Sequence, residues 1–311
     1  MHPFTKYTGE SVAALGEEKL IGEIGRWLGA ASPRAPFGIG DDCAVLPASQ
    51  GAQLITVDPV IYPHHFDDAV PPRAVGAKLL KRNLSDLAAM GGRPTAAVLA
   101  LTLDETVSLS WLEQFYRGLA QCARRYNVPI VGGDIAQGRC MVAASLTLLG
   151  EAAGPRTVTR TGAKLNDRIY VTGVLGGSLE SGHHYRFQPR LAEGAWLARQ
   201  ISVRAMMDVS DGLAKDLHGI TPAGTAPALF ADSLPRRTGV TLGAALSDGE
   251  DYELLFAVSS RENPAAFLRA WKKAFPRVRL SCIGHFATAH KLPEGVIDLG
   301  SFRGYEHLRK P

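Results

Sequence analysis

Apolar positions in the first half of the chain recur every three or four residues in three separate segments, a spacing typical of amphipathic helices. We expect these helices at residues 17–28, 73–90 and 110–127. The first is followed by Gly29, a common helix stop, and the third opens with Ser110 and Glu113 at the spacing of a capping box.

Shorter apolar runs bounded by turn residues predict strands. We expect strands at residues 37–46, 53–60, 96–103, 128–131, 141–150, 168–172, 252–258 and 280–284, and one further helix near 191–200. The strand at 128–131 is expected to end at Gly132 and Gly133. Residues 151–162 are rich in Gly, Pro, Arg and Thr and are the best candidate for a domain boundary. The pattern therefore predicts two α+β domains, residues 1–150 and 151–311.

The composition narrows the class of protein. The 311 residues are 46% hydrophobic and 21% charged, which is typical of a folded globular protein. A net charge of +4 without a basic run argues against a nucleic-acid partner. The four cysteines include no Cys-x-x-Cys pair, and no apolar stretch approaches the ~18 residues of a membrane span. We expect a cytoplasmic protein that binds no membrane.

Aspartates beside glycine or at the ends of apolar runs are the most informative candidate chemistry. They are Asp42, Asp58, Asp86, Asp134, Asp208 and Asp211. Carboxylates that converge from separate strands need cations to stay ionised, and hard oxygen ligands suit Mg²⁺, which usually coordinates substrate phosphates as well. Each aspartate alone is more often a turn or helix-cap residue, so a structural role and a metal site are both open at this point.

A local conflict lies within the second expected helix. Asn83, Ser85 and Asp86 are poor helix-interior residues, yet residues 74–90 otherwise read as a good helix. The conflict marks either a functional position or a helix break with a new N-cap at Ser85 or Asp86.

Asp208 and Asp211 lie three residues apart where a strand is expected to give way to a helix, with Ser210 between them. This arrangement can direct oxygen atoms and free N–H groups at a metal–phosphate unit. The chain has neither a Walker motif nor the His-Arg-Asp loop of protein kinases, so the ordinary nucleotide-binding fingerprints are absent.

Seven segments of the chain together resemble the thiamine-monophosphate kinase family, of the superfamily that also holds aminoimidazole ribonucleotide synthetase, selenophosphate synthetase and a hydrogenase-maturation protein. They are 38–46, 83–91, 132–134, 159–164, 208–213, 249–254 and 304–307. The resemblance implies an N-terminal mixed sheet with helices that binds ATP and Mg²⁺ and pairs across a homodimer into a barrel. It also implies a C-terminal α/β sandwich.

The activity that the resemblance implies is ATP-dependent phosphorylation of thiamine monophosphate to thiamine diphosphate by direct in-line transfer, with several Mg²⁺ ions. The implied metal ligands are Asp42, Thr56, Asp58, Asp86, Asp134, Asp208 and Asp211, among which Asp42, Asp86, Asp208 and Asp211 would be catalytic. Gly133, Asp134, Arg160 and Ser210 would bind ATP, and His65, Glu250 and Tyr305 would bind thiamine phosphate. Carboxylates, Mg²⁺ and an arginine supply the alignment and charge neutralisation that phosphoryl transfer needs.

The chain departs from the family's usual pattern near these residues. Val57 stands where Thr is usual, Pro59 where a small residue is usual, and residues 135–137 replace a Thr-Thr-Arg-like run. Gly177 stands where Asp is usual, and Asp248 where Gly is usual. Two other functions therefore stay open: a relative that phosphorylates another small acceptor, and a nucleotide-binding paralogue without turnover.

Overall fold

The structure, a computed structural model, describes residues 1–35, 37–39, 43–49 and 51–306. Its contacts divide the chain into two compact units. The first comprises Met1–Leu87 and Arg93–Glu151, and the second Ala88–Gly92 and Ala152–Pro311. Each unit is built around its own sheet, so the predicted α+β class is confirmed. Residues 88–92 pack with the second unit, which a simple boundary at 150/151 does not anticipate.

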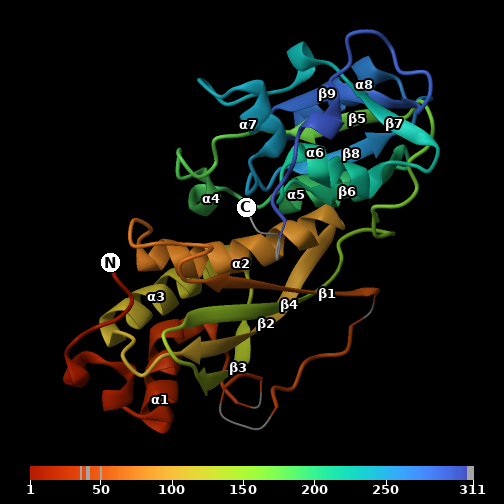
Figure 1. Ribbon diagram of the computed structural model, residues 1–311. Coiled ribbons are helices and arrows are strands. Elements are labelled where there is room, and N and C mark those ends of the chain that lie inside the picture. The colour runs from red at the N-terminus through yellow and green to blue at the C-terminus, as the bar shows by residue number, and fades with distance from the viewer. Residues whose placement is uncertain (36, 40–42, 50, 307–311) are drawn as a thin grey trace. The chain divides into compact units, whose positions relative to one another are not determined.

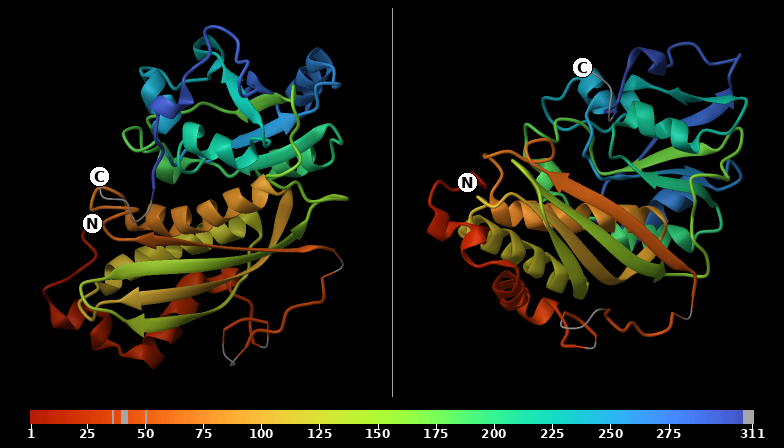
Figure 2. Two further views of the ribbon diagram at one scale, coloured as in Figure 1. Left: turned by 45° about the vertical axis from the view of Figure 1, so that its right-hand side comes forward. Right: turned by 60° about the horizontal axis from the view of Figure 1, so that its bottom comes forward.

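The first unit has a four-stranded sheet in the order β1-β4-β2-β3 (Figure 1). Its strands are β1 (Gln53–Ile61), β2 (Gly92–Leu103), β3 (Ile130–Gln137) and β4 (Val142–Ala152). β1 and β4 pair antiparallel, whereas β2 and β3 pair parallel, so the sheet is mixed. The long helices α2 (Pro72–Ala89) and α3 (Leu109–Tyr126) lie on the same face of it (Figure 2).

The two faces of this sheet differ in burial because side chains alternate along a strand. Val142 and Ala144 of β4 point to the helix-covered face and are buried beside Trp111 of α3. On the opposite face, Ile55 and Val57 of β1 are 73% and 60% exposed. The sheet of this unit thus presents apolar side chains on the face that α2 and α3 leave open.

The remaining elements of this unit are α1 (Glu17–Leu28) and three short 3₁₀ helices, η1 (Thr8–Glu10), η2 (Val12–Ala14) and η3 (Gly29–Ala31). The expected helix at 17–28 is confirmed, and Gly29 follows it with a positive φ of 53°. α3 ends before Asn127, as expected, and Asn127 adopts the left-handed conformation that closes a helix.

Three expectations for this unit are wrong. The side chain of Ser108 caps α3 by accepting a hydrogen bond from the Trp111 amide, so Ser110 lies inside the helix. β3 continues through Gly132 and Gly133 because its backbone stays paired with β2. In the 37–46 segment, the residues that the structure describes form no strand, since no neighbouring strand pairs with them.

The second unit has a five-stranded sheet in the order β6-β8-β5-β9-β7. Its strands are β5 (Arg168–Thr172), β6 (Val203–Asp208), β7 (Thr225–Leu229), β8 (Leu254–Val258) and β9 (Leu280–Thr288). Neighbouring strands pair antiparallel throughout. The helices are α4 (His183–Arg186), α5 (Leu191–Ala198), α6 (Leu213–Asp216), α7 (Leu242–Ser247) and α8 (Pro264–Ala274), with η4 (Leu217–Ile220), η5 (Ala231–Ser233) and η6 (Leu299–Ser301).

Both faces of this sheet are buried. Alternate residues of β5 and β8 enter two separate hydrophobic clusters: Tyr170 and Phe256 pack with α5 and α8, whereas Val171 and Leu255 pack with α6, η4 and α7. This explains why β5 and β8 read as continuous apolar runs instead of alternating ones. Leu254 rather than Tyr252 begins β8.

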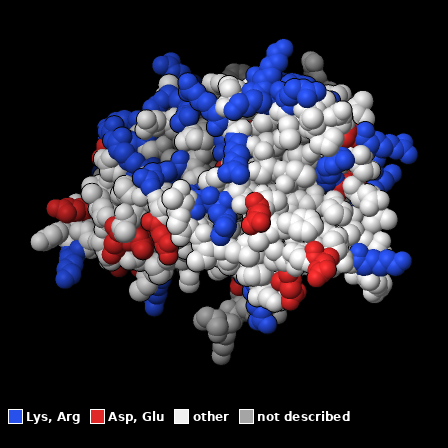
Figure 3. Space-filling model, turned by 90° about the horizontal axis from the view of Figure 1, so that it is seen from above, with Lys and Arg blue, Asp and Glu red and all other residues white. Residues whose placement is uncertain are grey.

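Two surface properties complete the description. No helix within the described ranges combines the length and the apolar character that a membrane crossing requires. On the face that Figure 3 shows, Lys and Arg side chains predominate in the upper part of the view, and Asp and Glu gather mainly in the lower part. Basic and acidic side chains are thus unevenly distributed over this face.

Candidate active site

In the first unit, β1 and α2 bring three predicted metal ligands together. Thr56 and Asp58 lie two residues apart on β1 and therefore on one face of it. The Thr56 hydroxyl donates to Oδ2 of Asp86 on α2 at 2.5 Å. One helical turn earlier, Nη2 of Arg82 lies 3.2 Å from Oδ1 of Asp58, and its Nη1 donates to the Pro59 carbonyl at 2.8 Å. These side chains form a compact polar group that combines hard oxygen atoms with the Arg82 guanidinium.

The local conflict in α2 is resolved without a break. The helix runs continuously over Pro72–Ala89, so the alternative of a new N-cap at Ser85 or Asp86 is wrong. Nδ2 of the fully buried Asn83 donates to the Leu79 carbonyl at 2.9 Å, one turn back, which satisfies its donor inside the helix. The tertiary contact of Asp86 with Thr56 overrides the weak helix propensity of this stretch.

Two hydrogen bonds with Ile61 fix the backbone and the ring of His65. Its amide donates to the Ile61 carbonyl at 2.8 Å, and the Ile61 amide donates to its Nδ1 at 3.1 Å. Nδ1 is therefore an acceptor, which places the proton of the neutral ring on Nε2. The fully buried Lys78 donates from Nζ to the His65 carbonyl at 2.8 Å.

Asp134 lies apart from the Thr56, Asp58 and Asp86 group. It is an exposed residue of β3, and β4 and β2 separate β3 from β1. Three strand spacings amount to ~14 Å, so one copy of this unit does not bring Asp134 to the other three. Asp42, the remaining predicted ligand, lies outside the described residues.

A cavity of about 430 Å³ and another of about 910 Å³ are present in the first unit, and only the larger one adjoins predicted site residues. It is lined by Gly132, Gly133, Asp134 and Ile135 of β3, by Ile24 and Leu28 of α1 and by Cys43 and Leu46, among others. A Cβ atom at Gly133 would lie 2.1 Å from the Leu99 carbonyl oxygen, so the close approach of β2 requires glycine there. The backbone of β3 is thus exposed to open space at the residues predicted to meet ATP.

In the second unit, the buried carboxylate of Asp216 orders the candidate site. The amides of Ser210 and Asp211 both donate to its Oδ2, at 2.9 and 3.0 Å. These two residues follow Asp208, which is also buried and ends β6. Burial raises the pKa of Asp216 to about 6, although the two amides act in the opposite direction. Oδ2 of Asp211 lies 2.6 Å from Nζ of Lys215.

The carbonyls of the same short segment hold the predicted acceptor-binding residues. The Glu250 amide donates to the Ser210 carbonyl at 2.7 Å, and the Tyr305 amide donates to the Asp211 carbonyl at 2.8 Å. The Tyr305 side chain is about half exposed. The last predicted residue of this unit, Arg160, is exposed and follows Thr159, whose carbonyl accepts from Met206 in β6.

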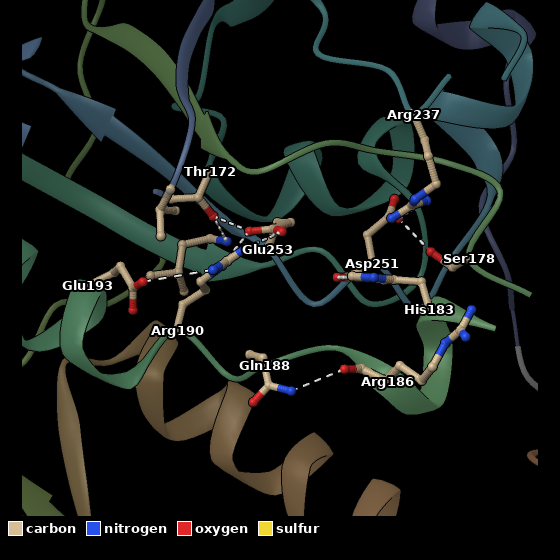
Figure 4. Close-up of polar contacts among 12 residues, drawn as sticks. Thr172, Ser178, His183, Arg186, Gln188, Arg190, Glu193, Arg237, Asp251 and Glu253 are labelled. Atoms are coloured by element: carbon tan, nitrogen blue, oxygen red, sulfur yellow. Dashed lines mark hydrogen bonds and ion pairs between the residues drawn. The ribbon is translucent and has the colours of Figure 1, made fainter. Parts of the chain in front are cut away.

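Two further acidic residues were not predicted. Oxygen atoms of the buried Glu253 accept from Nε and Nη2 of Arg190 at 2.7 and 2.6 Å, and its Oε2 also accepts from the Thr172 hydroxyl at 2.6 Å (Figure 4). The fully buried Asp251 faces Ser178 and Arg237. A possible sequence signal was three acidic residues within 250–253 directly before an apolar strand, because buried carboxylates need dedicated partners.

The described parts of the chain contain no cluster of three or more His, Cys, Asp or Glu side chains able to hold a metal ion. The predicted oxygen ligands instead form one group in the first unit, around Thr56 and Asp86, and one in the second, around Asp208 and Asp211. Each group offers hard oxygen atoms, the donor type that Mg²⁺ prefers.

Comparison with known proteins defines the class. Residues 40–152 match the family model described as AIR synthase related protein, N-terminal domain. The thiamine-monophosphate kinase of Rhodopirellula baltica is 35% identical over 80% of this chain and 83% of its own length. The solved thiamine-monophosphate kinase of Stenotrophomonas maltophilia is 30% identical with a TM-score of 0.74, over 91% of this chain and 98% of that one. A structure of AaThiL complexed with AMPPCP and TMP is 29% identical with a TM-score of 0.69, over 95% and 98%.

The first of these matches covers the part of the first unit that carries Thr56, Asp58, Asp86 and Asp134, and the other three extend over most of the chain. Identity of this level over four fifths of the sequence is sufficient to assign the family. The chain belongs to the thiamine-monophosphate kinase family.

Proposed function

We infer that this protein is a thiamine-phosphate kinase that transfers the γ-phosphoryl group of ATP to thiamine monophosphate. A terminal phosphate oxygen of thiamine monophosphate attacks the γ-phosphorus, the bond from that phosphorus to the β–γ bridging oxygen breaks, and ADP leaves. Family membership over most of the chain is the observation that carries this function. The relative in complex with AMPPCP, an ATP analogue, and TMP supports both substrates.

Several Mg²⁺ ions would be held by the two groups of oxygen ligands. In the first unit these are Thr56, Asp58 and Asp86, and in the second they are Asp208 and Asp211. Asp134, which lies apart from the first group, and Asp42 are further proposed ligands. Bound Mg²⁺ supplies charge neutralisation for the transferred phosphoryl group. Arg82, whose Nη2 lies 3.2 Å from Oδ1 of Asp58, adds a protein cation beside these ligands.

The ATP phosphates would meet the backbone of β3 at Gly133 and the side chains of Arg160 and Ser210. The open cavity beside residues 132–135 supports this role, because a nucleotide-binding strand must leave its backbone accessible. It also argues against the alternative of a paralogue with a collapsed cleft, in spite of the unusual residues 135–137.

The acceptor would be bound by His65, Glu250 and Tyr305. Thiamine carries a cationic thiazolium ring, which suits the carboxylate of Glu250 and the aromatic face of Tyr305. The Nε2–H of His65 is a hydrogen-bond donor suited to an acceptor phosphate, because its Nδ1 is already used as an acceptor.

A homodimer is the proposed assembly, with the N-terminal sheets pairing into a barrel. The exposed Ile55 and Val57 on the open face of β1 support it, because an apolar sheet face in water favours a covering partner. The mixed sheet also leaves β1 and β3 as edge strands, which pairing would protect.

The direct test is ADP release from the purified chain, with ATP, Mg²⁺ and thiamine monophosphate. Turnover is expected with thiamine monophosphate and is expected to be far slower with thiamine, pyridoxal phosphate or ribose 5-phosphate. Faster turnover with another acceptor would assign a different substrate, and nucleotide binding without turnover on any of them would favour the non-catalytic paralogue.

A further inference from the structure

Glu250, the proposed acceptor-binding carboxylate, lies in an unusual turn of the second unit. Its φ is +63° and that of Tyr252 is +51°, so two bulky residues adopt the left-handed region within three positions. Non-glycine residues keep this conformation only where their surroundings fix it, and such positions occur preferentially at functional sites. The contacts that fix the turn at residues 248–252 therefore decide where the Glu250 carboxylate lies.

Two carboxylates of the turn bind the glycine-rich loop at residues 173–178. Asp251 has no exposed surface and accepts from the Gly176 amide at 2.9 Å and from the Ser178 hydroxyl at 2.5 Å (Figure 4). Oδ2 of Asp248 accepts from the Gly177 amide at 2.7 Å. Three consecutive residues of the loop thus donate to two carboxylates that flank Glu250 on both sides.

The loop itself is firmly placed, so it is a suitable support. Gly176 and Gly177 both have positive φ, +80° and +66°, and a Cβ atom at Gly176 would lie 2.8 Å from the Ala245 backbone. Arg237 donates to the Gly176 carbonyl, and its Nη1 also lies 3.5 Å from Oδ1 of Asp251. Loop and turn are therefore held to the same part of the unit.

In this turn, hydrogen bonds and an ion pair restrict the backbone and the carboxylate of Glu250. Its amide donates to Ser210, its Oε1 accepts from the Tyr252 hydroxyl at 3.3 Å, and its Oε2 lies 3.4 Å from Nδ1 of His184. The Tyr252 ring in turn stacks on Phe187 with 4.0 Å between ring centroids. The carboxylate of Glu250 is thus oriented before any substrate binds, which lowers the entropic cost of binding a cation.

We propose that Asp248 and Asp251 are positioning residues for the acceptor: by binding the amides of Gly176 and Gly177 they hold the turn that presents Glu250 to thiamine monophosphate. The inference rests on the proposed function, because it assigns their effect to the acceptor and not to ATP. Neither carboxylate needs to touch the substrate. What matters is the hydrogen-bond acceptor at each position.

The partly buried Asp248 provides the cleanest test. Asp248→Ala removes the acceptor for the Gly177 amide, whereas Asp248→Asn keeps one in its amide oxygen. We expect Asp248→Ala to raise the KM for thiamine monophosphate at least about fivefold and to leave the KM for ATP within about twofold, since lost ground-state binding appears in KM. Asp248→Asn is expected to stay within about twofold of wild type for both substrates.

Two further variants separate positioning from general destabilisation. Asn263→Ala removes the N-cap of α8 in the same unit and is expected to lower Tm without changing either KM. Both oxygens of Asp251 accept hydrogen bonds, from the Gly176 amide and the Ser178 hydroxyl, and asparagine keeps only one of these acceptors. Asp251→Asn is therefore expected to act in the same direction as Asp248→Ala, provided that its circular dichroism matches wild type. An unchanged KM for thiamine monophosphate in Asp248→Ala, equal effects on both substrates, or failure of Asp248→Asn to restore binding would overturn the proposal. A wild-type protein without turnover on thiamine monophosphate would instead overturn the proposed function, and with it this inference.

Discussion

The carboxylate of Asp248 accepts a hydrogen bond from the amide of Gly177 at 2.7 Å. The family resemblance implies aspartate at 177 and glycine at 248, whereas this chain has Gly177 and Asp248. Because the two residues are in contact, such an exchange would keep one carboxylate and one glycine at the same place in the fold. We infer that these two departures from the family pattern are coupled.

This coupling predicts the behaviour of a double variant. Gly177→Asp alone should lower kcat/KM for thiamine monophosphate at least about fivefold, because its carboxylate would face that of Asp248. Gly177→Asp combined with Asp248→Gly should recover to within about threefold of wild type. The measurement is a double-mutant cycle on kcat/KM, and additive losses would show that the two positions act independently.

Asp86 and Asp208 should be required for turnover and not for folding. Asp86→Asn and Asp208→Asn keep the shape of the side chain but remove the charge that a metal ion needs, so each should lower kcat by at least about a hundredfold at saturating Mg²⁺. Asp232→Asn, at an exposed aspartate of η5, serves as the control and should keep the wild-type rate. Near wild-type kcat in either of the first two variants would mean that the ligand set is misassigned.

Tyr305 should contribute to acceptor binding alone. Tyr305→Ala is expected to raise the KM for thiamine monophosphate about fivefold with little change in the KM for ATP, since a stacking contact contributes on the order of 1 kcal/mol. Tyr305→Phe keeps the ring and should behave like wild type. If both variants bind thiamine monophosphate like wild type, the ring of Tyr305 does not meet the substrate.

The buried Asp251 predicts a pH dependence of stability. Burial raises its pKa to about 7, against about 3.9 in an unfolded chain. The folded state therefore keeps a proton that the unfolded state releases, so the stabilisation is full below about pH 4 and declines as pH rises to about 7. In urea unfolding, wild type should lose stability relative to Asp251→Asn between about pH 5 and pH 7. Parallel curves for the two proteins would contradict the raised pKa.

The open sheet face predicts the oligomeric state. Sedimentation at micromolar concentration should give a dimer, and Ile55→Glu, which places a charge on that face, should shift it to monomer. Ile201→Glu is the matched control, because Ile201 is also exposed but lies in the second unit. A wild-type monomer would exclude the dimer. A dimer that persists in Ile55→Glu would place the interface on another surface.

Periodicity predicted the elements whose apolar pattern is strong and failed where pairing or tertiary contacts decide. β5 was predicted with its exact bounds, because a continuous buried run between turns has few alternatives. β7 and α8 were not predicted: β7 contains Pro227, which weakens a strand pattern, and is an edge strand of its sheet. A local pattern also cannot show that the described residues of 37–46 form no strand. The reason is that a strand needs a neighbouring strand to pair with, and the local sequence does not show whether one is present.

The candidate residues of the site were taken from motifs, and the structure brings only some of them together. Thr56 with Asp86, and Asp211 with Tyr305, meet as close neighbours although 30 and 94 positions separate them in the chain. Asp251 was passed over because a motif shows residue types and not which carboxylates are buried. Only the packed fold shows which residues are buried and which hydrogen bonds they make. Burial and hydrogen bonds distinguish a residue that binds the substrate from a residue that holds the binding residue in place.

The two-residue segment Ser210–Asp211 has a consequence for how new acceptors can be acquired. Its amides are bound by Asp216, and its carbonyls hold Glu250 on one side and Tyr305 on the other. A backbone adjustment that reshapes the Glu250 turn for a different small molecule would therefore also displace Ser210 and Asp211, which we propose to serve the nucleotide and its metal ions. Substitutions of side chains such as that of Tyr305 can change which acceptor binds and leave this backbone in place. Directed evolution toward a new acceptor should therefore begin with such side chains.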